Sequence, residues 1–409
     1  MSAIDSDDTF STGEDVAAAQ KPASIVHPKI LQFRLKKVGH AKAKECLNRL
    51  ILLLETARPE SIIVLIGPGG SGKSTLLDRL KRHLANLYAD RMAADPGFLP
   101  YVSVEAVTAL DGAYNWKDGL TRTLVEAGEV LIKQKAMNRF EVDLDGEKLT
   151  QLRRLVRDEL RRALENLFRH RDVPVLMIDE ASAILMGRKG VLPLLQFEVL
   201  KSLAVRLKKP IFLTGAYDLL GILDGTGQLV RRSDVVHFSR YTQQGTTEDF
   251  VEGRFVEVAD VQHFRNALHT LLEAMDVDKE VDFTQYSEYF MMKSVGCVGN
   301  LKDWLERAYA LTLAAEVNIL TLEIVRKAEA TNKTLIKLTS EAMFGEERLK
   351  DLPDDELAGM QGWAKLPRLP RSVSDVGVAS VAEKSIKPKK PVRPGTRSPS
   401  RDPVGGLNG

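Results

Sequence analysis

The sequence predicts an α/β domain built around a parallel five-stranded sheet, followed by a small helical domain. Short apolar segments rich in β-branched residues alternate with helical patterns along the first part of the chain. Strands that alternate with helices form parallel sheets with helices on both faces. The five predicted strands are residues 61–66, 101–104, 173–178, 210–213 and 235–238.

Apolar residues that recur at helical spacing predict the helices. Beyond Tyr241 we expect no further strand, because only helical periodicity follows. We therefore expect the α/β domain at residues 26–244 and a helical lid domain at residues 245–348. The predicted helices are most of 25–57, 115–170, 194–207, 261–275, 286–292, 300–315 and 322–339.

The composition is that of a soluble globular protein, with 44% hydrophobic and 28% charged residues in 409. The two cysteines, Cys46 and Cys297, are too few for a disulfide framework or a four-ligand zinc site, so a reducing cytosol is expected. The apolar runs are shorter than the roughly 20 residues that span a bilayer, and the acidic first residues lack an apolar signal core. We therefore expect a cytoplasmic protein with no membrane partner.

Both ends of the chain are expected to be disordered. Residues 1–25 form an acidic arm, and residues 349–409 form a basic, proline-rich tail. Such segments cannot bury enough apolar surface to offset the entropy of ordering. From Lys384 onward the tail has seven Lys and Arg residues against one Asp. It could contact nucleic acid or an acidic partner, or act as a solubilising extension.

A glycine-rich loop lies between the first predicted strand and the helical pattern after it. This context is the one in which G-x-x-x-x-G-K-[ST] forms a phosphate-binding loop rather than an ordinary turn. The backbone N–H groups of such a loop surround phosphate oxygens, Lys73 reaches the β- and γ-phosphates, and the Ser74 hydroxyl ligates Mg²⁺. The predicted nucleotide-binding residues are Gly67, Pro68, Gly69, Gly70, Ser71, Gly72, Lys73, Ser74 and Thr75.

Polar residues end two other predicted strands. Asp179 and Glu180 follow the third strand, and Thr214 follows the fourth. Because ligands of parallel sheets bind at the carboxyl ends of the strands, these residues are expected at one site. Asp179 suits the metal, Glu180 could polarise the attacking water, and Thr214 could hydrogen-bond the γ-phosphate or that water. A helix cap or surface pair of acids, and a threonine that simply favours a strand, are the structural alternatives.

Three basic residues extend this site. Arg231 and Arg232 follow a helix-like segment, and either could be an arginine finger given to a neighbouring subunit. Their alternative role is to cap the carboxyl end of a helix. In the helical domain, Lys302 lies near the start of a predicted helix, where it could contact phosphate from above.

Together these motifs resemble those of the AAA+ ATPases over about residues 26–345. GPGGSGKST corresponds to Walker A, VPVLMIDE to Walker B, IFLTG to the first sensor, QLVRR to the finger box and GNLKDWL to the second sensor. The resemblance implies hydrolysis of ATP to ADP and phosphate with Mg²⁺, the metal being held by Ser74 and Asp179. Many AAA+ proteins have arginine at the position of Lys302, so a bidentate phosphate contact is not expected here.

Three stretches are also similar to transposon target-selection regulators of the TnsC/TniB type: YNWKDGLTRTLVEAGE, GQLVRRSDVVHFSRY and VGCVGNLKDWLERA. The later stretch EAMFGEERL is similar to the usual ending of that family. This resemblance implies a bacterial, DNA-associated protein that polymerises with ATP into a helical filament or ring on duplex DNA. It would link a target-selection protein to a transposase until hydrolysis disassembles it. Lys117, Thr121 and Arg122 would then hold DNA phosphates without reading sequence.

Two other classes of protein share these motifs. One is an AAA+ motor or loader that acts on nucleic acid or protein outside transposition. The other is a signalling NTPase of the apoptotic-regulator kind, with no role on DNA. The lid and the finger box favour the regulator and the motor over the signalling NTPase.

Overall fold

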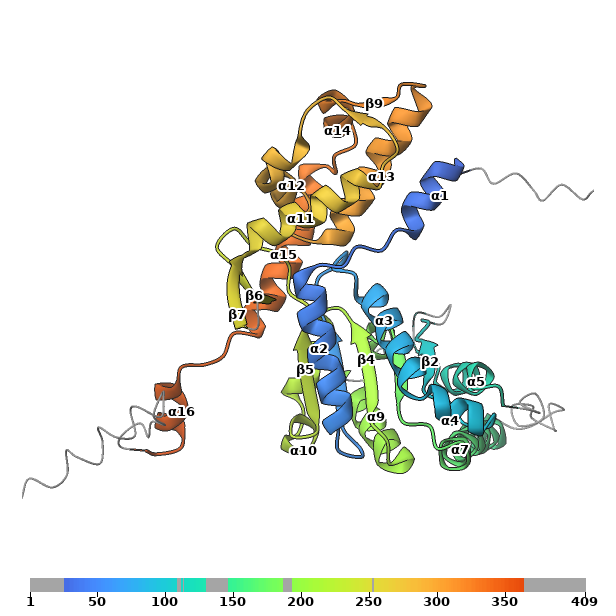
Figure 1. Ribbon diagram of the computed structural model, residues 1–409. Coiled ribbons are helices and arrows are strands. Elements are labelled where there is room, and N and C mark those ends of the chain that lie inside the picture. The colour runs from blue at the N-terminus through green and yellow to red at the C-terminus, as the bar shows by residue number, and fades with distance from the viewer. Residues whose placement is uncertain are drawn as a thin grey trace, which may run out of the picture. The chain divides into compact units, whose positions relative to one another are not determined.

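The computed structural model describes residues 26–108, 112, 114–129, 146–186, 193–251 and 254–363. The predicted acidic arm and most of the predicted basic tail lie outside these residues. The chain divides into two compact units, Met1–Leu349 and Lys350–Gly409. The described part of the second unit contains helix α16 (Asp354–Met360). The sheet, the helices that cover it and the candidate site all belong to the first unit. Figure 1 shows the strands and helices.

Five parallel strands form the central sheet, which confirms the predicted fold class. The strands are β1 (Ile62–Ile66), β2 (Val102–Glu105), β3 (Leu176–Asp179), β4 (Ile211–Gly215) and β5 (Ser233–His237), in the order β2-β3-β4-β1-β5. Their carboxyl ends are aligned, because Ile66 pairs with Gly215 and His237, and Glu105 pairs with Asp179. The residues that follow β1, β3 and β4 therefore meet at one edge of the sheet.

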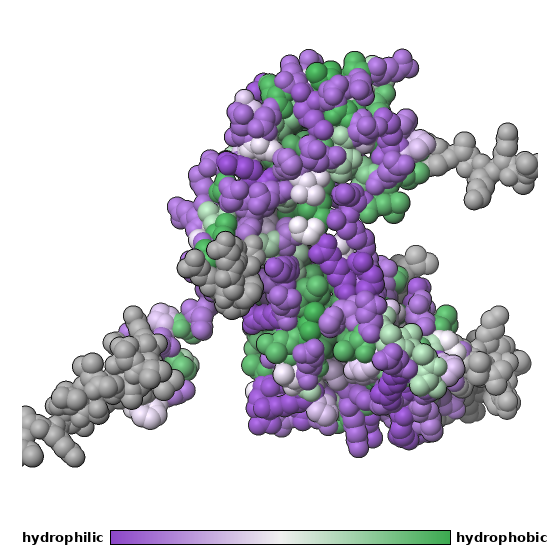
Figure 2. All heavy atoms as spheres, viewed as in Figure 1, coloured by the Kyte–Doolittle hydropathy of each residue, from purple (hydrophilic) through white to green (hydrophobic). Residues whose placement is uncertain are grey.

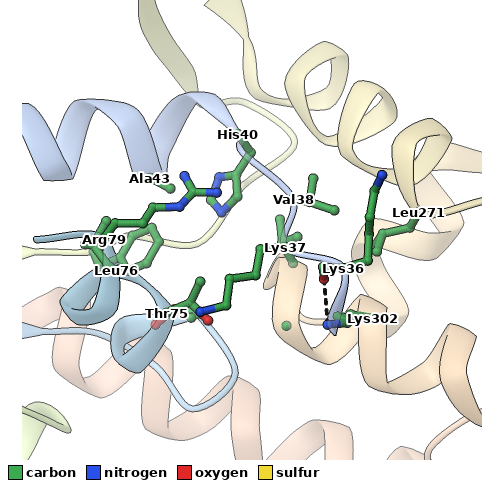
Figure 3. A pocket seen from close by; sticks show the side chains of 15 residues that line it. Lys36, Lys37, Val38, His40, Ala43, Thr75, Leu76, Arg79, Leu271 and Lys302 are labelled. Carbon is green, nitrogen blue, oxygen red and sulfur yellow. Dashed lines mark hydrogen bonds between the residues drawn. The ribbon is translucent and has the colours of Figure 1, made fainter. Parts of the chain in front are cut away.

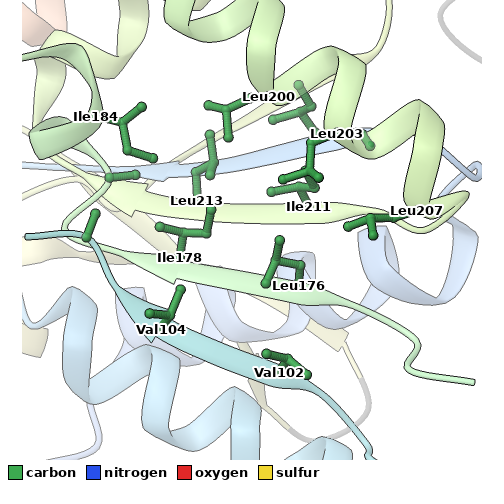
Figure 4. Close-up of a cluster of buried hydrophobic side chains, with 14 of the residues drawn as sticks. Val102, Val104, Leu176, Ile178, Ile184, Leu200, Leu203, Leu207, Ile211 and Leu213 are labelled. Carbon is green, nitrogen blue, oxygen red and sulfur yellow. The ribbon is translucent and has the colours of Figure 1, made fainter. Parts of the chain in front are cut away.

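Helices cover both faces of the sheet. They are α2 (Ala41–Thr56), α3 (Lys73–Leu87), α4 (Ala89–Ala94), α5 (Trp116–Glu126), α7 (Gly146–His170), α8 (Ser182–Leu185), α9 (Pro193–Leu207), the 3₁₀ helix η1 (Tyr217–Asp224) and α10 (Gly227–Val230). Successive side chains of a strand point to opposite faces. Ile63 and Leu65 therefore join a core with α2 and α3, whereas Val64 joins the core formed with α5, α7 and α9. Figure 4 shows leucines of α9 against Ile211 and Leu213 of β4.

A helical region (residues 260–348) follows, as the sequence predicts. Its elements are α11 (Asp260–Glu273), the 3₁₀ helix η2 (Phe283–Tyr286), α12 (Ser287–Lys293), α13 (Val298–Ala314), α14 (Leu322–Lys327) and α15 (Asn332–Arg348). The pattern over residues 322–339 predicts one helix, but the structure has two. The break occurs because Thr331 caps α15, its side chain accepting a hydrogen bond from the backbone N–H of Thr334 at 3.3 Å.

The expectation that strands end after Tyr241 is wrong. β6 (Thr246–Val251) and β7 (Arg254–Ala259) form an antiparallel pair, and β8 (Asp278–Lys279) and β9 (Ile319–Leu320) form a short parallel pair. The sequence of the antiparallel pair, TTEDFV and RFVEVA, is rich in β-branched and aromatic residues interleaved with charged ones. That is a strand signal. Each of these two strands has only six residues. The helical patterns that follow are much longer, and the prediction for this part of the chain was based on them.

The N-terminal helix α1 (Pro28–Leu35) packs into the core of the helical region. Ile30 and Phe33 are buried with residues of α11 and α13, and the rings of Phe33 and Tyr309 meet edge to face at 5.9 Å. Arg34 forms an ion pair with Glu306 at 2.6 Å. Figure 1 shows α1 beside α13. The helix that precedes the sheet in the sequence is thus held by the helical region, and the domain boundary at residue 245 stays a prediction.

A buried carboxylate joins α2 to the start of the helical region. Asp260 is fully buried and accepts hydrogen bonds from the Thr247 hydroxyl at 2.7 Å and the backbone N–H of Thr242 at 2.9 Å. The Lys42 ammonium lies 3.0 Å from the same carboxylate. Every charge in this group is paired, as burial requires.

We expect Asp260→Ala to lower the free energy of unfolding by about 3–5 kcal/mol, because it leaves Lys42 buried without its counter-charge. Denaturant unfolding followed by circular dichroism measures this. Asp118→Ala is the matched control. It removes an ion pair whose Asp118 and Arg122 side chains are each about half exposed, so it should cost less than about 1 kcal/mol. Equal losses in the two variants would contradict the argument.

The face of the molecule seen in Figure 2 combines hydrophilic and hydrophobic residues. Most residues on this face are hydrophilic. Hydrophobic side chains also lie on it, many of them over the part of the α/β region that contains α2, α9 and α10 in Figure 1. None of the described helices is both long enough and apolar enough to cross a bilayer.

Candidate nucleotide-binding site

The glycine-rich loop joins the carboxyl end of β1 to α3, which begins at Lys73. Gly70 and Gly72 have φ values of 77° and 98°, in the left-handed region that favours glycine. Such turns orient successive backbone N–H groups toward one point and create an anion-binding concavity. The positive end of α3 lies at the same place and adds to the attraction for phosphate.

Lys73 is already directed into this loop. Its ammonium donates hydrogen bonds to the carbonyls of Gly67 at 2.9 Å and Pro68 at 3.0 Å. Burial lowers the pKa of Lys73, and the nearby carboxylates of Glu180 and Asp179 oppose that shift. A lysine held among acids at the loop can move from carbonyl to phosphate oxygens without leaving the site.

The structure brings Asp179, Glu180 and Thr214 together, as the sequence predicts. The Asp179 carboxylate accepts hydrogen bonds from the Thr214 hydroxyl and from the backbone N–H of Glu180, the latter at 2.9 Å. The backbone N–H of Ala181 donates to the Thr214 carbonyl at 2.7 Å. Thr214 is fully buried, whereas Glu180 is exposed. The ends of β3 and β4 therefore form one connected unit that leaves the Glu180 carboxylate accessible.

Glu180 has an unusual backbone conformation, with φ at 49°. For a residue with a β-carbon this costs about 1–3 kcal/mol, and such residues concentrate at functional sites. The strain lies between β3 and α8, where the chain turns sharply after Asp179.

Two residues of this edge were not anticipated from the sequence. The Ser182 hydroxyl donates to the Asp218 carboxylate at 2.6 Å and accepts from the backbone N–H of Ala216 at 3.1 Å. These two hydrogen bonds connect the segments that follow β3 and β4. The negative charge of Asp218 also opposes the lowering of the Lys73 pKa. Asp218 follows Thr214 by four residues, so the rule that sites form at strand ends could have found it.

Arg231 and Arg232 lie at the opposite edge of the sheet. The Arg232 carbonyl accepts a hydrogen bond from Ile62, the first residue of β1, at 2.7 Å. The five residues of β1 separate this point from Gly67, which is roughly 15 Å at the usual rise of a strand. The Arg232 guanidinium pairs with Glu60 at 2.8 Å. Arg231 is exposed and has no ion pair among the described residues.

Lys302 lies in a pocket beside the first turns of α3 (Figure 3). Its ammonium donates to the carbonyls of Arg34 at 2.6 Å and Lys36 at 2.8 Å. Burial is the main cause that lowers its pKa. The structure therefore places Lys302 at the carboxyl end of α1, and its contact with phosphate stays a prediction.

The pocket around Lys302 is lined both by α3 and by the helical region. It adjoins the phosphate loop and combines apolar with cationic side chains. Burial, with a smaller contribution from Arg79, lowers the pKa of His40 to about 4, so this ring is neutral at pH 7. The lining residues include Lys36, Lys37, Val38, His40, Leu76, Arg79, Phe238, Leu271 and Val298.

The predicted DNA contacts lie on α5. The Asn115 side chain caps this helix by accepting from the backbone N–H of Lys117 at 3.0 Å. The Thr121 hydroxyl donates to the Lys117 carbonyl at 2.7 Å, and Arg122 pairs with Asp118 at 2.6 Å. Within the described part of the chain Lys117 has no ion pair. Of the two cations, only Lys117 is therefore free to meet phosphate without breaking a contact.

The chain also offers ligands for Mg²⁺ next to the phosphate loop. The described residues contain no group of three or more His, Cys, Asp or Glu side chains that could hold a metal unaided. Mg²⁺ bound with a nucleotide does not need such a group, because phosphates and water supply most of its ligands. The exposed Ser74 hydroxyl and the Asp179 carboxylate, both hard oxygen donors at this edge, fit the remaining positions.

A family model covers the segment that contains the phosphate loop and the ends of β3 and β4. Residues 56–223 match the family model described as an AAA domain. This segment runs from before β1 into η1 and is similar to that family.

Several solved structures are similar over most of the chain. The ADP form of the Aeropyrum pernix ORC2 protein has 14% identity and a TM-score of 0.47, over 88% of this chain and 85% of that chain. The Aeropyrum pernix ORC1 protein in complex with DNA has 16% identity and a TM-score of 0.46, over 73% and 67%. The Thermotoga maritima RuvB Holliday junction branch migration motor has 15% identity and a TM-score of 0.35, over 81% and 86%. No curated protein matches this sequence.

Proposed function

We propose that this protein is an ATPase whose hydrolysis controls its assembly on duplex DNA. The observation that carries the ATPase proposal is the meeting of Lys73, Asp179, Glu180 and Thr214 at the carboxyl edge of the sheet. Phosphoryl transfer to water needs bound phosphates, a metal ion and an oriented water molecule. These residue types can bind the phosphates, ligate the metal and orient the water. Bound Mg²⁺ would neutralise charge on the phosphates.

In this proposal each residue has one task. Lys73 holds the β- and γ-phosphates, which it reaches from the loop carbonyls that it contacts now. Glu180 accepts a proton from the attacking water, since its carboxylate is exposed at the strand end. Thr214 positions Asp179 through their hydrogen bond and keeps it oriented toward the metal. Ser74 and Asp179 provide the protein ligands of Mg²⁺.

We further propose that a second copy of the chain completes the site. Arg231 lies at the edge of the sheet away from its own loop and is exposed. The helices α9 and α10 leave Leu195, Val199 and Val230 exposed on this part of the molecule. Apolar groups next to an unpaired arginine suit contact with another copy, which would place Arg231 on the phosphates bound there. Repetition of this contact from copy to copy would build a ring or a helical filament.

The biological role that we propose is regulation of transposition in the bacterial cytoplasm. Its support is the similarity of three stretches, at residues 114–129, 227–241 and 295–308, to regulators of the TnsC/TniB type. In this role the ATP-bound assembly links a target-selection protein to a transposase, and hydrolysis ends the link. Each of the three stretches contains a residue with a task in this proposal or its sequence prediction: Lys117 on α5, Arg231 after α10 and Lys302 on α13.

Binding to duplex DNA tests the proposal. Binding should require ATP or a slowly hydrolysed analogue, because only the assembly aligns many copies of α5. It should weaken steeply with salt, since the contacts are to phosphates. Lys117→Ala/Arg122→Ala should reduce affinity about equally on every duplex sequence and lower the salt slope by at least about 1 for each copy bound, the contribution of the free Lys117. Fluorescence anisotropy with several duplexes measures all of these quantities.

The control replaces two exposed cations elsewhere, Arg326→Ala/Lys327→Ala on α14, with the same change in net charge. It should leave DNA affinity within about twofold of the original protein. Normal DNA binding by the α5 variant, or a loss confined to one sequence, would exclude α5 as the contact. Deletion of the basic segment after Lys384 is then the next test. Hydrolysis stimulated by a protein substrate and not by DNA would favour a motor or loader.

A further inference from the structure

The start of α13 lies directly on the phosphate loop. The backbone N–H of Gly299 donates to the Gly70 carbonyl at 2.9 Å. A β-carbon on Gly299 would come within 2.3 Å of that carbonyl oxygen, so only glycine allows this approach. The helical region therefore contacts the loop through the backbone of its G-N-L-K segment.

Asn300 is the side chain that this contact places over the loop. A β-carbon on Gly70 would lie 1.8 Å from the Asn300 carboxamide oxygen, so the side chain occupies the space that glycine leaves open. The carboxamide nitrogen donates to the Ser294 carbonyl at 3.2 Å and, at 3.5 Å, to the Gly69 carbonyl. The second contact is near the limit of a hydrogen bond and is therefore weak.

Asn300 also lines a cavity of about 350 Å³ on one side of the loop. Gly67, Pro68 and Asp218 line the same cavity. Gly67 and Pro68 are also the residues whose carbonyls accept hydrogen bonds from the Lys73 ammonium, so a terminal phosphate held by Lys73 would lie next to this cavity. The weak Asn300 contact with Gly69 can then be exchanged for a bond to a phosphate oxygen, which is shorter and stronger because the acceptor is charged.

Lys302 is oriented differently. Residues two apart on a helix lie on roughly opposite faces, and Lys302 donates to the Arg34 and Lys36 carbonyls at the end of α1 (Figure 3). These bonds, with the ion pair between Arg34 and Glu306, hold α1 against α13. The ammonium already has two acceptors in a partly buried place, and leaving them would expose the carbonyl end of α1.

We infer that Asn300 is the residue of the helical region that contacts the terminal phosphate, and that Lys302 fastens α1 to α13. The inference depends on the proposed binding of ATP at the loop. It makes Asn300 the group that distinguishes ATP from ADP. Its contact couples the terminal phosphate to the position of the helical region, because Gly299 and Asn300 begin α13.

The test compares the affinities for a fluorescent ATP analogue that is hydrolysed slowly and for fluorescent ADP. Asn300→Ala should weaken binding of the ATP analogue about tenfold and change ADP binding by less than about twofold, as expected for one bond to a charged group. Asn300→Asp should weaken the ATP analogue further, because a carboxylate repels the added phosphate. Asn266→Ala, an exposed position on α11, is the matched control and should change neither affinity.

Lys302→Ala is the competing variant. It should keep the preference for ATP over ADP and unfold at a lower temperature, since two carbonyls of α1 lose their donor. The opposite pattern, with the preference lost in Lys302→Ala and kept in both Asn300 variants, would overturn the inference and support Lys302 as the phosphate contact. Unfolding temperatures without nucleotide show whether the Asn300 variants are folded. Failure of the original protein to bind either nucleotide would overturn the proposed ATPase as well.

Discussion

Glu180→Gln should lower the rate of ATP hydrolysis by at least about 100-fold and leave ATP binding intact. A positioned general base contributes about 10²–10⁴-fold to a rate, and glutamine keeps the shape of the side chain without its basicity. Lys73→Ala should instead abolish binding, because Lys73 contacts the phosphates before any reaction begins. Steady-state phosphate release and equilibrium nucleotide binding distinguish the two effects.

Glu105→Gln is the control for Glu180. Glu105 ends β2, pairs in register with Asp179 and is also exposed at this edge of the sheet. Its substitution should leave hydrolysis within about twofold, which would show that the position of Glu180 matters and not the total charge of the edge. Hydrolysis at the original rate in Glu180→Gln would mean that another group takes the proton.

Arg231→Ala should lower hydrolysis about 10³-fold or more, the size of effect that an arginine finger supplies. Arg232→Ala should have a much smaller effect, because the Arg232 guanidinium is already paired with Glu60 in its own chain. The matched pair of variants removes the same charge from adjacent positions. Phosphate release at several protein concentrations measures both, since a shared site makes specific activity rise as copies assemble.

Mixing two inactive proteins tests whether the site is shared. Arg231→Ala protein keeps its Glu180, and Glu180→Gln protein keeps its Arg231. Where the two meet, one of the two possible interfaces has every residue in place, so the mixture should recover part of the activity. A mixture that stays inactive while the copies demonstrably assemble would argue that Arg231 does not act on a neighbour.

Some features of the site could be predicted from the sequence because they depend on neighbours in the chain. The phosphate loop needs a buried strand, glycines with positive φ and a helix that starts at Lys73, and all of these lie within one continuous segment. The meeting of Asp179 with Thr214 needed only one further rule, that parallel strands end at the same edge. The five strands and the parallel type of the sheet could be predicted from the alternation of strand and helix patterns, whereas the order of the strands in the sheet came from the structure.

Other features required the packed molecule. Which arginine is free depends on Glu60, a residue that precedes β1 and reaches Arg232 only because β1 and β5 are neighbours in the sheet. The packing of α1 with α11 and α13 depends on the burial of Phe33 against Tyr309, far along the chain. Periodicity describes one element at a time and contains no information about which elements meet.

The contact between the helical region and the loop shows most clearly which features local sequence determines and which depend on tertiary packing. The motif G-N-L-K indicates that a helix begins near Gly299, but it does not say whether Asn300 or Lys302 faces the phosphates. Asn300 and Gly69 are 231 residues apart in the sequence. Their meeting is decided by how α13 packs on the loop. That packing needs two glycines: Gly299 leaves room for the backbone of Gly70, and Gly70 leaves room for the Asn300 side chain. Local sequence therefore determines the phosphate loop, whereas tertiary packing decides which side chain lies over it.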